Sequence, residues 1–553
     1  GNSSKAENPT HLFNEVKSYD VTFSITTPNG CNNDTTKTVH IRPYIDVSQS
    51  PYFTDFEQGN DNWYPESETS INSWELGKPN TGTLSNAASG QNAWVTNLDG
   101  EYNNSEVSYM KSPCFNFENV EKPMIKMNIF PVVDEGDDGV VLMSTTDGIS
   151  WRKIGGIQNG KNWYNSFSII AGPGGQPQGW SMDTTSDWLD SRHHLNNLIG
   201  AKRVQFRFAF SSDAGGSNEG FAFDDVWIGE RSKNIMIEHF TNASDAKSAE
   251  VMDDLENVIA SNYNDVIDIH YHTSNPGADP FYKDNPTDPT VRSFYYGKSF
   301  VPLSIINGTE DFDYSNVTNT PSNLEVSLKA LEDPMFEIDF ISSIDGNNIN
   351  INSTITALKD IPLQEYTIIT AIIENEITGI NGENGMTSFR SVVKKLLPSA
   401  RGYTFSKKFN KDEEIQVNNN WELKNIYDQE QLNVVVFIQN VKTKEVYQVK
   451  AQNKLARPTD INENMIAGAG ALKIHLFPNP VKDELNILFN SALIEDLHYK
   501  VFNVTGKLVQ SGSISSQSNT FKMDTEKLKE GMHFIMLYNE NEVIKNIKFI
   551  KAR

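Results

Sequence analysis

Short runs of β-branched and aromatic residues recur along the whole chain, and turn-forming Asn, Gly, Asp and Pro residues separate them. Many of these runs alternate apolar with polar residues, as half-buried β-strands do. Strands that follow one another at this spacing are typical of antiparallel β-sandwiches and not of parallel α/β units. Clear examples are residues 19–25, 204–210, 433–438 and 533–538. The chain is therefore predicted to be mainly β, with several β-sandwich or jelly-roll domains in tandem.

One stretch departs from this pattern. Apolar residues fall at helical spacing within residues 248–263, and an apolar strand pattern follows at residues 266–270. We therefore expect one α/β domain inside an otherwise β chain.

Length and charge narrow the classes of function. The chain has 553 residues, which at about 150 residues per domain predicts three to four domains. Asp and Glu number 72 against 47 Lys and Arg, a formal net charge of −25. Nucleic acids and anionic membranes bind mainly through Lys and Arg, so both are disfavoured as partners. No run approaches about 18 apolar residues, so no transmembrane segment is expected, and the N-terminus lacks the pattern of a signal peptide.

The chain has two cysteines, Cys31 and Cys114. This number excludes a disulfide-dense fold and a four-cysteine zinc site. The sequence allows a bridge between them but does not require one, so their pairing stays open.

Residues 1–45 contain strand patterns at residues 19–25 and 38–41, after a short motif at residues 8–13. This order resembles the second half of a PKD domain, an immunoglobulin-like sandwich that usually serves as a spacer. Half a sandwich would leave strand edges unpaired. We therefore expect a longer polypeptide, with a further domain upstream.

Residues 46–232 resemble a MAM-like, lectin-type jelly roll of secreted bacterial proteins. The segments that carry the resemblance are residues 53–57, 74–77, 93–97, 112–115, 204–208 and 220–226.

The jelly-roll resemblance implies a structural calcium ion near the first and last strands. Glu57 and either Asp224 or Asp225 stand at the corresponding positions, and calcium is bound by carboxylate and carbonyl oxygens. The alternative is that these acids cap turns and face water. Other acidic candidates are Asp99, Asp213 and the turn at residues 134–139, where a solvated hairpin is favoured over a cation.

Aromatic residues of the same segment suggest carbohydrate binding, because sugar rings stack on exposed aromatic rings. Trp and Tyr are also common core residues, so burial is the alternative. The candidates are Trp63, Tyr64, Trp163, Tyr164, Trp180 and Trp188.

Residues 233–318 resemble the thioredoxin-like outer-membrane lipoproteins, and Pro302 matches the cis-proline of that fold. The segments that carry the resemblance are residues 235–242, 248–263, 266–270 and 300–308. Redox members need Cys-x-x-Cys at the start of the first helix, where the helix N-terminus lowers the thiol pKa. Asp245 and Ser248 occupy those positions, so no oxidoreductase activity is expected. The fold is predicted to serve as a scaffold or binding module, with Asp245 capping the helix.

Two histidine pairs have spacings that occur in metal sites. His270 and His272 would share one face of a strand, and His193 and His194 are adjacent. No Cys or third His is near either pair in sequence, so polar strand ends are favoured over a metal.

Residues 319–452 alternate as a further β-sandwich, similar to the β-domain that follows the thioredoxin-like part in the same family. They carry no recognisable chemistry. Residues 453–466 are predicted to form a flexible linker.

Residues 467–553 resemble the type A sorting domain of type IX secretion. The resemblance implies binding to the translocon and to a sorting peptidase, export across the outer membrane, and removal of this segment at the upstream linker. The remainder would be anchored on the cell surface or released. The motif residues are Pro478, Asn479, Pro480, Gly506, Gly531 and Lys551.

Two Asp-Thr-Thr motifs fit the pattern of bacterial O-glycosylation in organisms with this pathway. Thr35 and Thr184 are the acceptor candidates.

The sequence contains no His-Glu-x-x-His motif, phosphate loop or Gly-x-Ser-x-Gly motif. The favoured hypothesis is a set of non-catalytic adhesion or scaffold modules with an export signal, on a secreted or cell-surface protein. One alternative is the accessory C-terminal region of a secreted metallopeptidase whose catalytic domain lies upstream. Another is a carbohydrate-binding jelly roll. Whether the parent protein is an enzyme stays open.

Overall fold

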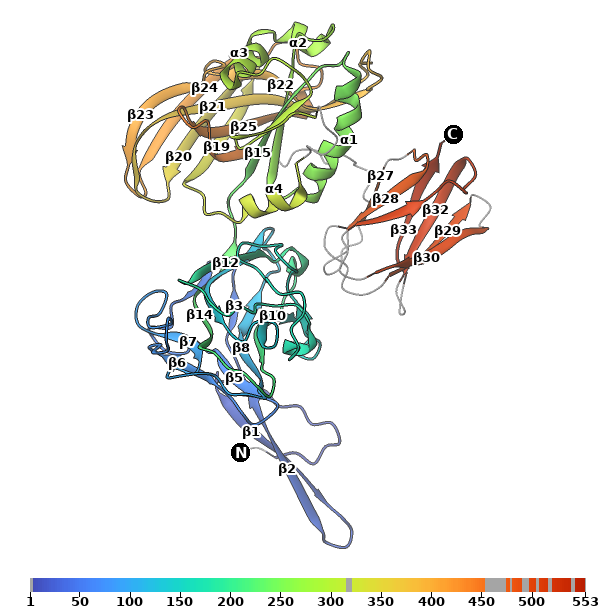
Figure 1. The fold of residues 1–553 in the computed structure, drawn as a ribbon. Helices are drawn as coiled ribbons and strands as arrows, with labels where there is room; N and C mark the ends of the chain where they lie inside the picture. The colour runs from blue at the N-terminus through green and yellow to red at the C-terminus, as the bar shows by residue number, and fades with distance from the viewer. Residues whose placement is uncertain are drawn as a thin grey trace. The chain divides into compact units, whose positions relative to one another are not determined.

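The computed structural model describes residues 3–314, 321–452, 474–477, 480–489, 497–503, 507–515, 520–538 and 543–552. The chain divides into two compact units, Gly1–Glu230 and Arg231–Arg553 (Figure 1). The prediction of a mainly β chain is confirmed, since strands account for 48% of the described residues and helices for 10%.

The first unit begins with an antiparallel hairpin of β1 (Ser18–Thr26) and β2 (Asn32–His40). Alternation along β1 puts Val21, Phe23 and Ile25 on one face, and all three side chains are exposed. No further strand pairs with this hairpin among the described residues.

Residues 44–230 form a sandwich of two six-stranded sheets. The strands of the first sheet are β3 (Tyr44–Asp46), β5 (Tyr64–Ser67), β8 (Val107–Asn116), β10 (Gly139–Thr145), β11 (Arg152–Lys153) and β13 (Val204–Ser211). Those of the second are β4 (Tyr52–Thr54), β6 (Trp74–Gly77), β7 (Ala93–Thr96), β9 (Pro123–Val132), β12 (Leu189–His194) and β14 (Gly220–Glu230). Two 3-10 turns, Pro173–Gly175 and Asn196–Leu198, lie in the connections.

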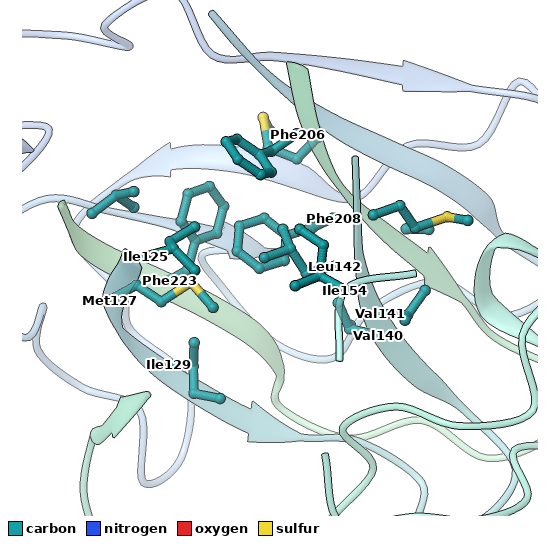
Figure 2. Close-up of a cluster of buried hydrophobic side chains, with 14 of the residues drawn as sticks. Ile125, Met127, Ile129, Val140, Val141, Leu142, Ile154, Phe206, Phe208 and Phe223 are labelled. Carbon is teal, nitrogen blue, oxygen red and sulfur yellow. The ribbon is translucent and has the colours of Figure 1, made fainter. Parts of the chain in front are cut away.

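The core of this sandwich follows from alternation along the strands. On β13, Phe206 and Phe208 point inward, while Gln205 and Arg207 point outward. The ring of Phe208 lies 4.5 Å from that of Phe223 on the opposite sheet, and both are labelled in Figure 2. The jelly roll therefore has a continuous aromatic and aliphatic core.

The second unit opens with the predicted α/β element. The order along the chain is β15 (Ile235–Thr241), α1 (Ala246–Ser261), β16 (Val266–His272), α2 (Pro280–Asp284), α3 (Thr287–Tyr296), β17 (Leu303–Ile306), β18 (Glu310–Phe312) and α4 (Asn323–Ala330). β15 is parallel to β16 and antiparallel to β17, and β17 is antiparallel to β18. The predicted helix is confirmed, and its buried residues Met252, Leu255 and Ile259 pack against β15 and β16.

The sheet continues beyond the expected boundary at residue 319. The further strands are β21 (Ile361–Thr378), β22 (Ser388–Leu397), β23 (Tyr403–Phe409), β25 (Leu432–Asn440) and β26 (Val446–Ala451). β22 joins β16 in parallel through a single register pair, His270↔Val392. One buried cluster contains Phe240 and Ile269 from the first part together with Val393 and Phe437 from the second. The two parts therefore share one nine-stranded sheet.

A three-stranded sheet of β19 (Phe336–Asp345), β20 (Asn348–Ala357) and β24 (Glu414–Glu422) packs on this continuation. A 3-10 turn, Gln429–Gln431, precedes β25. Ile338 and Ile351 of the small sheet share a core with Ile368 and Val436 of the large one, as predicted for a β-sandwich.

The C-terminal region contains two sheets around a separate core. The first consists of β27 (Ile474–Phe477), β28 (Glu484–Phe489) and β31 (Thr520–Asp524). The second consists of β29 (Leu497–Asn503), β30 (Leu508–Ile514), β32 (Gly531–Tyr538) and β33 (Val543–Lys551).

Buried ion pairs connect the two parts of the nine-stranded sheet. Arg390 on β22 donates from Nε and Nη2 to both carboxylate oxygens of Asp268 on β16, at 3.0 and 3.1 Å. Burial alone would raise the pKa of Asp268, but Arg390 and His270 hold it well below its usual value. Further along β22, Lys395 Nζ lies 2.9 Å from a carboxylate oxygen of Asp288 on α3.

We predict that Arg390→Met destabilises the second unit by about 3 kcal/mol, because it leaves the Asp268 carboxylate buried without its countercharge. Pulse proteolysis of the full chain in urea should show an earlier midpoint for residues 231–452. Lys424→Met removes an exposed pair with Glu422 and should leave that midpoint unchanged. Equal midpoints for both variants would contradict the role given to the Asp268–Arg390 pair.

Candidate functional site

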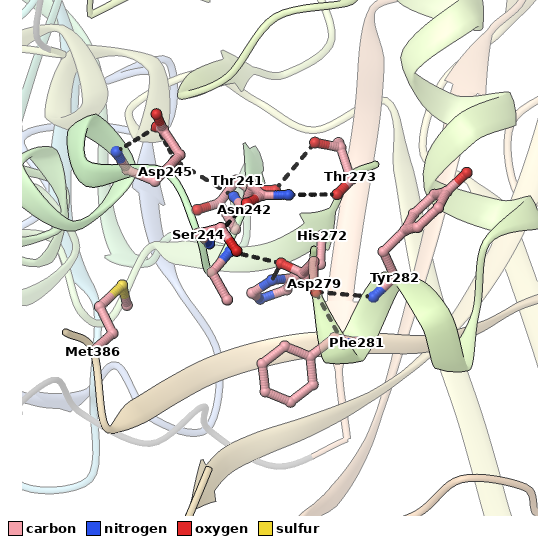
Figure 3. Close-up of polar contacts among 12 residues, drawn as sticks. Thr241, Asn242, Ser244, Asp245, His272, Thr273, Asp279, Phe281, Tyr282 and Met386 are labelled. Atoms are coloured by element: carbon pink, nitrogen blue, oxygen red, sulfur yellow. Dashed lines mark hydrogen bonds and ion pairs between the residues drawn. The ribbon is translucent and has the colours of Figure 1, made fainter. Parts of the chain in front are cut away.

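The first candidate site lies where β15 ends and α1 begins, at the positions predicted to replace Cys-x-x-Cys (Figure 3). Oδ2 of Asp245 accepts hydrogen bonds from the Ser248 backbone N–H and from the Ser248 hydroxyl, both at 2.7 Å. The predicted role of Asp245 as helix cap is confirmed. A carboxylate and a hydroxyl cannot form a disulfide, so these two side chains have no dithiol chemistry.

Asp279 organises the neighbouring loop, and sequence reasoning missed it. Oδ2 accepts from the Ala243 N–H at 2.6 Å and lies 2.8 Å from Nδ1 of His272. Oδ1 accepts from the N–H groups of Phe281 and Tyr282 at the start of α2. Burial raises the pKa of Asp279, but His272 and the N–H donors outweigh it and hold the pKa below its usual value. The Asp279-Pro280 pair is a helix-start signal that could have revealed this role.

The loop between β21 and β22 covers the start of α1. The Asn384 amide donates to the carbonyl oxygens of Asn242 and Asp245 at 3.3 and 3.1 Å, and its backbone N–H donates to the Ala243 carbonyl at 3.1 Å. A Cβ atom on Gly382 would lie 2.8 Å from the same Ala243 oxygen, so the backbones approach closely. A partner protein therefore has restricted access to the helix start.

The Val301–Pro302 peptide bond is cis, and Pro302 is buried directly before β17.

The histidines of β16 are buried, which corrects the expectation of polar strand ends. His270 Nε2 lies 3.0 Å from Asp268, whereas His272 contacts Asp279. The ring of His239 lies 5.0 Å from that of His270, and its Nδ1 lies 2.9 Å from the Ser304 hydroxyl. Burial lowers the pKa of both His239 and His270. No group of three His, Cys, Asp or Glu side chains within the described ranges is arranged to hold a metal ion.

His193 is also buried, with its ring 4.7 Å from that of Trp163.

The acids predicted to bind calcium surround one loop of the jelly roll, residues 87–92. Oε1 of Glu57 accepts from the N–H groups of residues 91 and 92, and Oδ2 of Asp224 accepts from those of residues 88 and 89. Both oxygens of Asp225 accept from side chains, Ser89 and Asn128. Burial, and then the neighbouring charge of Asp225, raise the pKa of Asp224 to about 7. The N–H donors already satisfy most of these oxygens, so the arrangement does not by itself fit a cation, and calcium there stays a prediction.

The other acidic candidates lie in separate hydrogen bonds. Asp99 accepts from the Asn80 amide at 2.7 Å, and Asp213 accepts from the Gly215 N–H at 2.8 Å. Residues 134–139 form the predicted turn between β9 and β10, with the N–H of Asp138 donating to the Asp134 carbonyl.

Most of the aromatic residues proposed to stack on sugars are in the core, and that expectation is wrong for them. The exposed fractions are 0% for Trp63, 3% for Trp163, 0% for Tyr164 and 1% for Trp180, while Tyr64 and Trp188 are half-buried. These four rings lie in connecting segments outside the strands, and they pack into the core between the sheets. Sequence alone could not assign them to the inner face.

A different group of side chains faces outward on the first sheet. The guanidinium of Arg207 lies 4.0 Å from the ring centre of Tyr109 and 4.4 Å from that of Trp151. Beside them, Lys111 Nζ pairs with Glu66 at 2.5 Å. This outer face combines the buried ring of Tyr109 and the half-buried ring of Trp151 with charged groups.

The C-terminal motif residues lie at strand ends where they are described. Gly531 begins β32 with φ 122°, and Lys551 ends β33 with its Nζ donating to the Lys482 carbonyl. Pro480 is exposed, and the following N–H, of Val481, donates to the Ile550 carbonyl at 2.7 Å. Pro478, Asn479 and Gly506 lie outside the described residues.

Two predictions remain, the glycosylation sites and the pairing of the cysteines. Thr35 and Thr184 are exposed. Cys31 and Cys114 are both free thiols.

These sheets and their loops define a multidomain β protein. Residues 475–552 match the family described as "Secretion system C-terminal sorting domain". The protein is a type IX secretion cargo, exported across the outer membrane to the cell surface or the extracellular space. No helix in the described part of the chain has the length and apolar character needed to span a membrane.

Comparisons with individual proteins give more distant likenesses. Bacillopeptidase F of Bacillus subtilis (strain 168) is 27% identical over 195 residues, which is 35% of this chain and 11% of that protein. HBP35 of Porphyromonas gingivalis is 16% identical with a TM-score of 0.33, over 59% of this chain and 100% of that one. The cleaved adhesin domain of Lys-gingipain from Porphyromonas gingivalis W83 is 14% identical with a TM-score of 0.20, over 33% of this chain and 99% of that one.

We predict that Asp224 makes the stability of the first unit fall as pH rises from about 4 to about 7. In this window the folded state holds a proton that the unfolded state has lost, because the pKa is about 7 in the fold against a reference value of 3.8. Over this pH range the free energy of unfolding falls by about 4 kcal/mol at most. Thermal melting in chelator should show it, and Asp224→Asn should abolish it.

The same melting experiments show whether Glu57 and Asp224 bind a calcium ion or only the backbone N–H groups. If Glu57 and Asp224 bind calcium, adding it at pH 8 raises the melting temperature over that in chelator, and the difference disappears at pH 5. Identical melting temperatures with calcium and with chelator at pH 8 would contradict calcium binding at this site.

Proposed function

We propose that the chain provides non-catalytic adhesion or display modules of a secreted or cell-surface protein, followed by its export signal. The observation that carries this proposal is the site at the start of α1. Asp245 and Ser248 replace the redox cysteines, and the Asn384 loop covers them. A site without thiols that is also covered suits a scaffold.

We infer that residues 233–318 form a thioredoxin-like domain that has lost redox function. The supporting observations are the strand order β16-β15-β17-β18, the helix between β15 and β16, and the cis-proline before β17. The finer assignments of residues 1–45 as half of a PKD domain and residues 46–232 as a MAM-like jelly roll are proposals of the same kind. The exposed hairpin β1–β2 and the two-sheet sandwich support them.

We further propose that a sorting peptidase removes the C-terminal domain within residues 453–466, and that the rest is anchored at the surface or released. The match of residues 475–552 to the sorting family supports this step.

Deleting residues 475–552 should keep the protein inside the cell, because the translocon would have no signal to bind. Cell fractionation with an antibody against residues 46–232 measures this directly. A variant lacking residues 1–40 instead should still be exported. External protein after deletion of the tail would contradict the proposal.

One alternative is that the chain is the accessory region of a secreted peptidase. The favouring observation is the partial match to Bacillopeptidase F, of which the chain covers 11%. A peptidase domain encoded upstream would support this alternative, whereas the chain by itself should not cleave casein.

A second alternative is glycan binding by the jelly roll. The observation that favours it is the half-buried ring of Trp151 beside the Arg207 guanidinium, 4.4 Å apart on the outer face.

If that face binds glycans, Trp151→Ala should weaken binding about tenfold, since the loss of one stacking contact costs about 1.4 kcal/mol. A glycan array followed by calorimetry of the full chain measures the change. Phe53→Ala removes an exposed ring from the other sheet and should have no effect. No binding to any glycan on the array would remove this alternative.

A further inference from the structure

Lys394 is a buried lysine at an irregular point of β22. Register pairs run from Ile372↔Lys395 to Ile373↔Val393, so Lys394 is the extra residue of a β-bulge. Bulges change the direction of a side chain, and this one turns Lys394 into the protein, where its side chain is 2% exposed. An amine at this depth needs a specific partner.

The first partner is Glu374 on β21, whose side chain is fully buried. Its Oε2 lies 3.2 Å from Lys394 Nζ, and among the described residues neither atom has a hydrogen bond. Oε1 accepts from the N–H groups of Tyr427 and Asp428, at 2.9 and 2.7 Å. These two bonds fix the carboxyl group with its other oxygen toward the amine.

The second partner is Asp284, the last residue of α2. Its Oδ2 lies 3.9 Å from Lys394 Nζ and accepts a hydrogen bond from the Tyr427 hydroxyl at 2.9 Å. The Asn285 amide donates to the Lys394 carbonyl at 3.1 Å and holds the end of α2 on β22. The Tyr427 ring, 4.5 Å from Nζ, closes the site.

The site therefore brings together a nucleophile, a carbonyl acceptor and a proton carrier. Burial lowers the pKa of Lys394, which favours the neutral amine that attacks carbonyl carbon. Groups held close together in a site with little water react far faster than the same groups in solution. A simple ion pair would not need a second carboxyl group beside the first.

We propose that Lys394 and Asp284 become joined by an isopeptide bond, with Glu374 as the proton carrier. Glu374 takes a proton from the ammonium group, and the neutral Nζ attacks Cγ of Asp284. The N–C bond forms and one C–O bond of Asp284 breaks. Glu374 passes the first proton to the leaving oxygen and then carries to it the second proton that the nitrogen loses, so the oxygen leaves as water. The ammonium and carboxylate pair is thus converted into an amide and one water molecule, with no oxidant, reductant or cofactor.

Such a bond would connect the two parts of the nine-stranded sheet covalently. Asp284 lies before residue 319 and Lys394 lies after it, and within residues 231–314 and 321–452 the only register pair between the parts is His270↔Val392. A covalent connection there would keep the parts together when the protein is pulled or partly digested outside the cell.

The mass of the purified full chain under denaturing conditions tests the proposal. We expect the protein to be lighter than its sequence by one water molecule, and tryptic digestion to give a branched peptide that joins Asp284 to Lys394. The branched peptide distinguishes this bond from a cyclised Asp residue, which loses water without a branch. The full sequence mass, or a branch between other residues, would overturn the proposal.

Variants of acidic residues test the roles proposed for Glu374 and Asp284. Glu374→Gln should retain the full mass, because it cannot carry the proton, while Glu422→Gln on the exposed face of β24 should lose the water as the wild type does. Asp284→Ala changes a partly exposed side chain and should also retain the full mass, which provides a second comparison if Glu374→Gln does not fold. The same branch in Glu374→Gln would overturn the role of Glu374.

Discussion

The second unit depends on the ion pair between Asp268 and Arg390. Moving a carboxylate and a guanidinium out of water costs free energy. Their mutual attraction offsets this cost only when the two groups lie side by side. They lie on β16 and β22, the two strands that meet through one register pair. The ion pair therefore adds a specific side-chain contact between these two strands, which share only one register pair. A second buried pair, Glu238 with Arg292, holds α3 on the same sheet at 2.6 Å, and Gln439 on β25 reaches the adjoining Tyr296 hydroxyl.

This joining explains why the start of α1 is covered. The loop that bears Asn384 belongs to the hairpin β21–β22, which is positioned by its pairing with β16. The capped start of α1 and its cover by the Asn384 loop are thus parts of one architecture. If the chain displays other domains, as we propose, this arrangement would supply the rigid body that display requires.

Several features could be predicted from the sequence because they depend on local chemistry. The helix α1 follows from its apolar period and from Asp245 as cap, and the sorting domain follows from motifs that are contiguous in the chain. The burial of Trp63 and Trp180 could not be predicted, because both lie in connecting segments whose path over the sheets no local pattern reports. The pairing of β16 with β22 joins residues 270 and 392, and no local pattern reports a contact of that range. The outer face of Tyr109, Trp151 and Arg207 is assembled from separate strands and was missed for the same reason.

Native-state hydrogen exchange of the full chain tests most directly whether residues 231–314 and 321–452 form one body. The account predicts that the slowest amides of β15 and β16 share one opening free energy with those of β21 and β25, because the sheet and its core are continuous. A separate, lower opening free energy for β15 and β16, with β21 and β25 still protected, would contradict it.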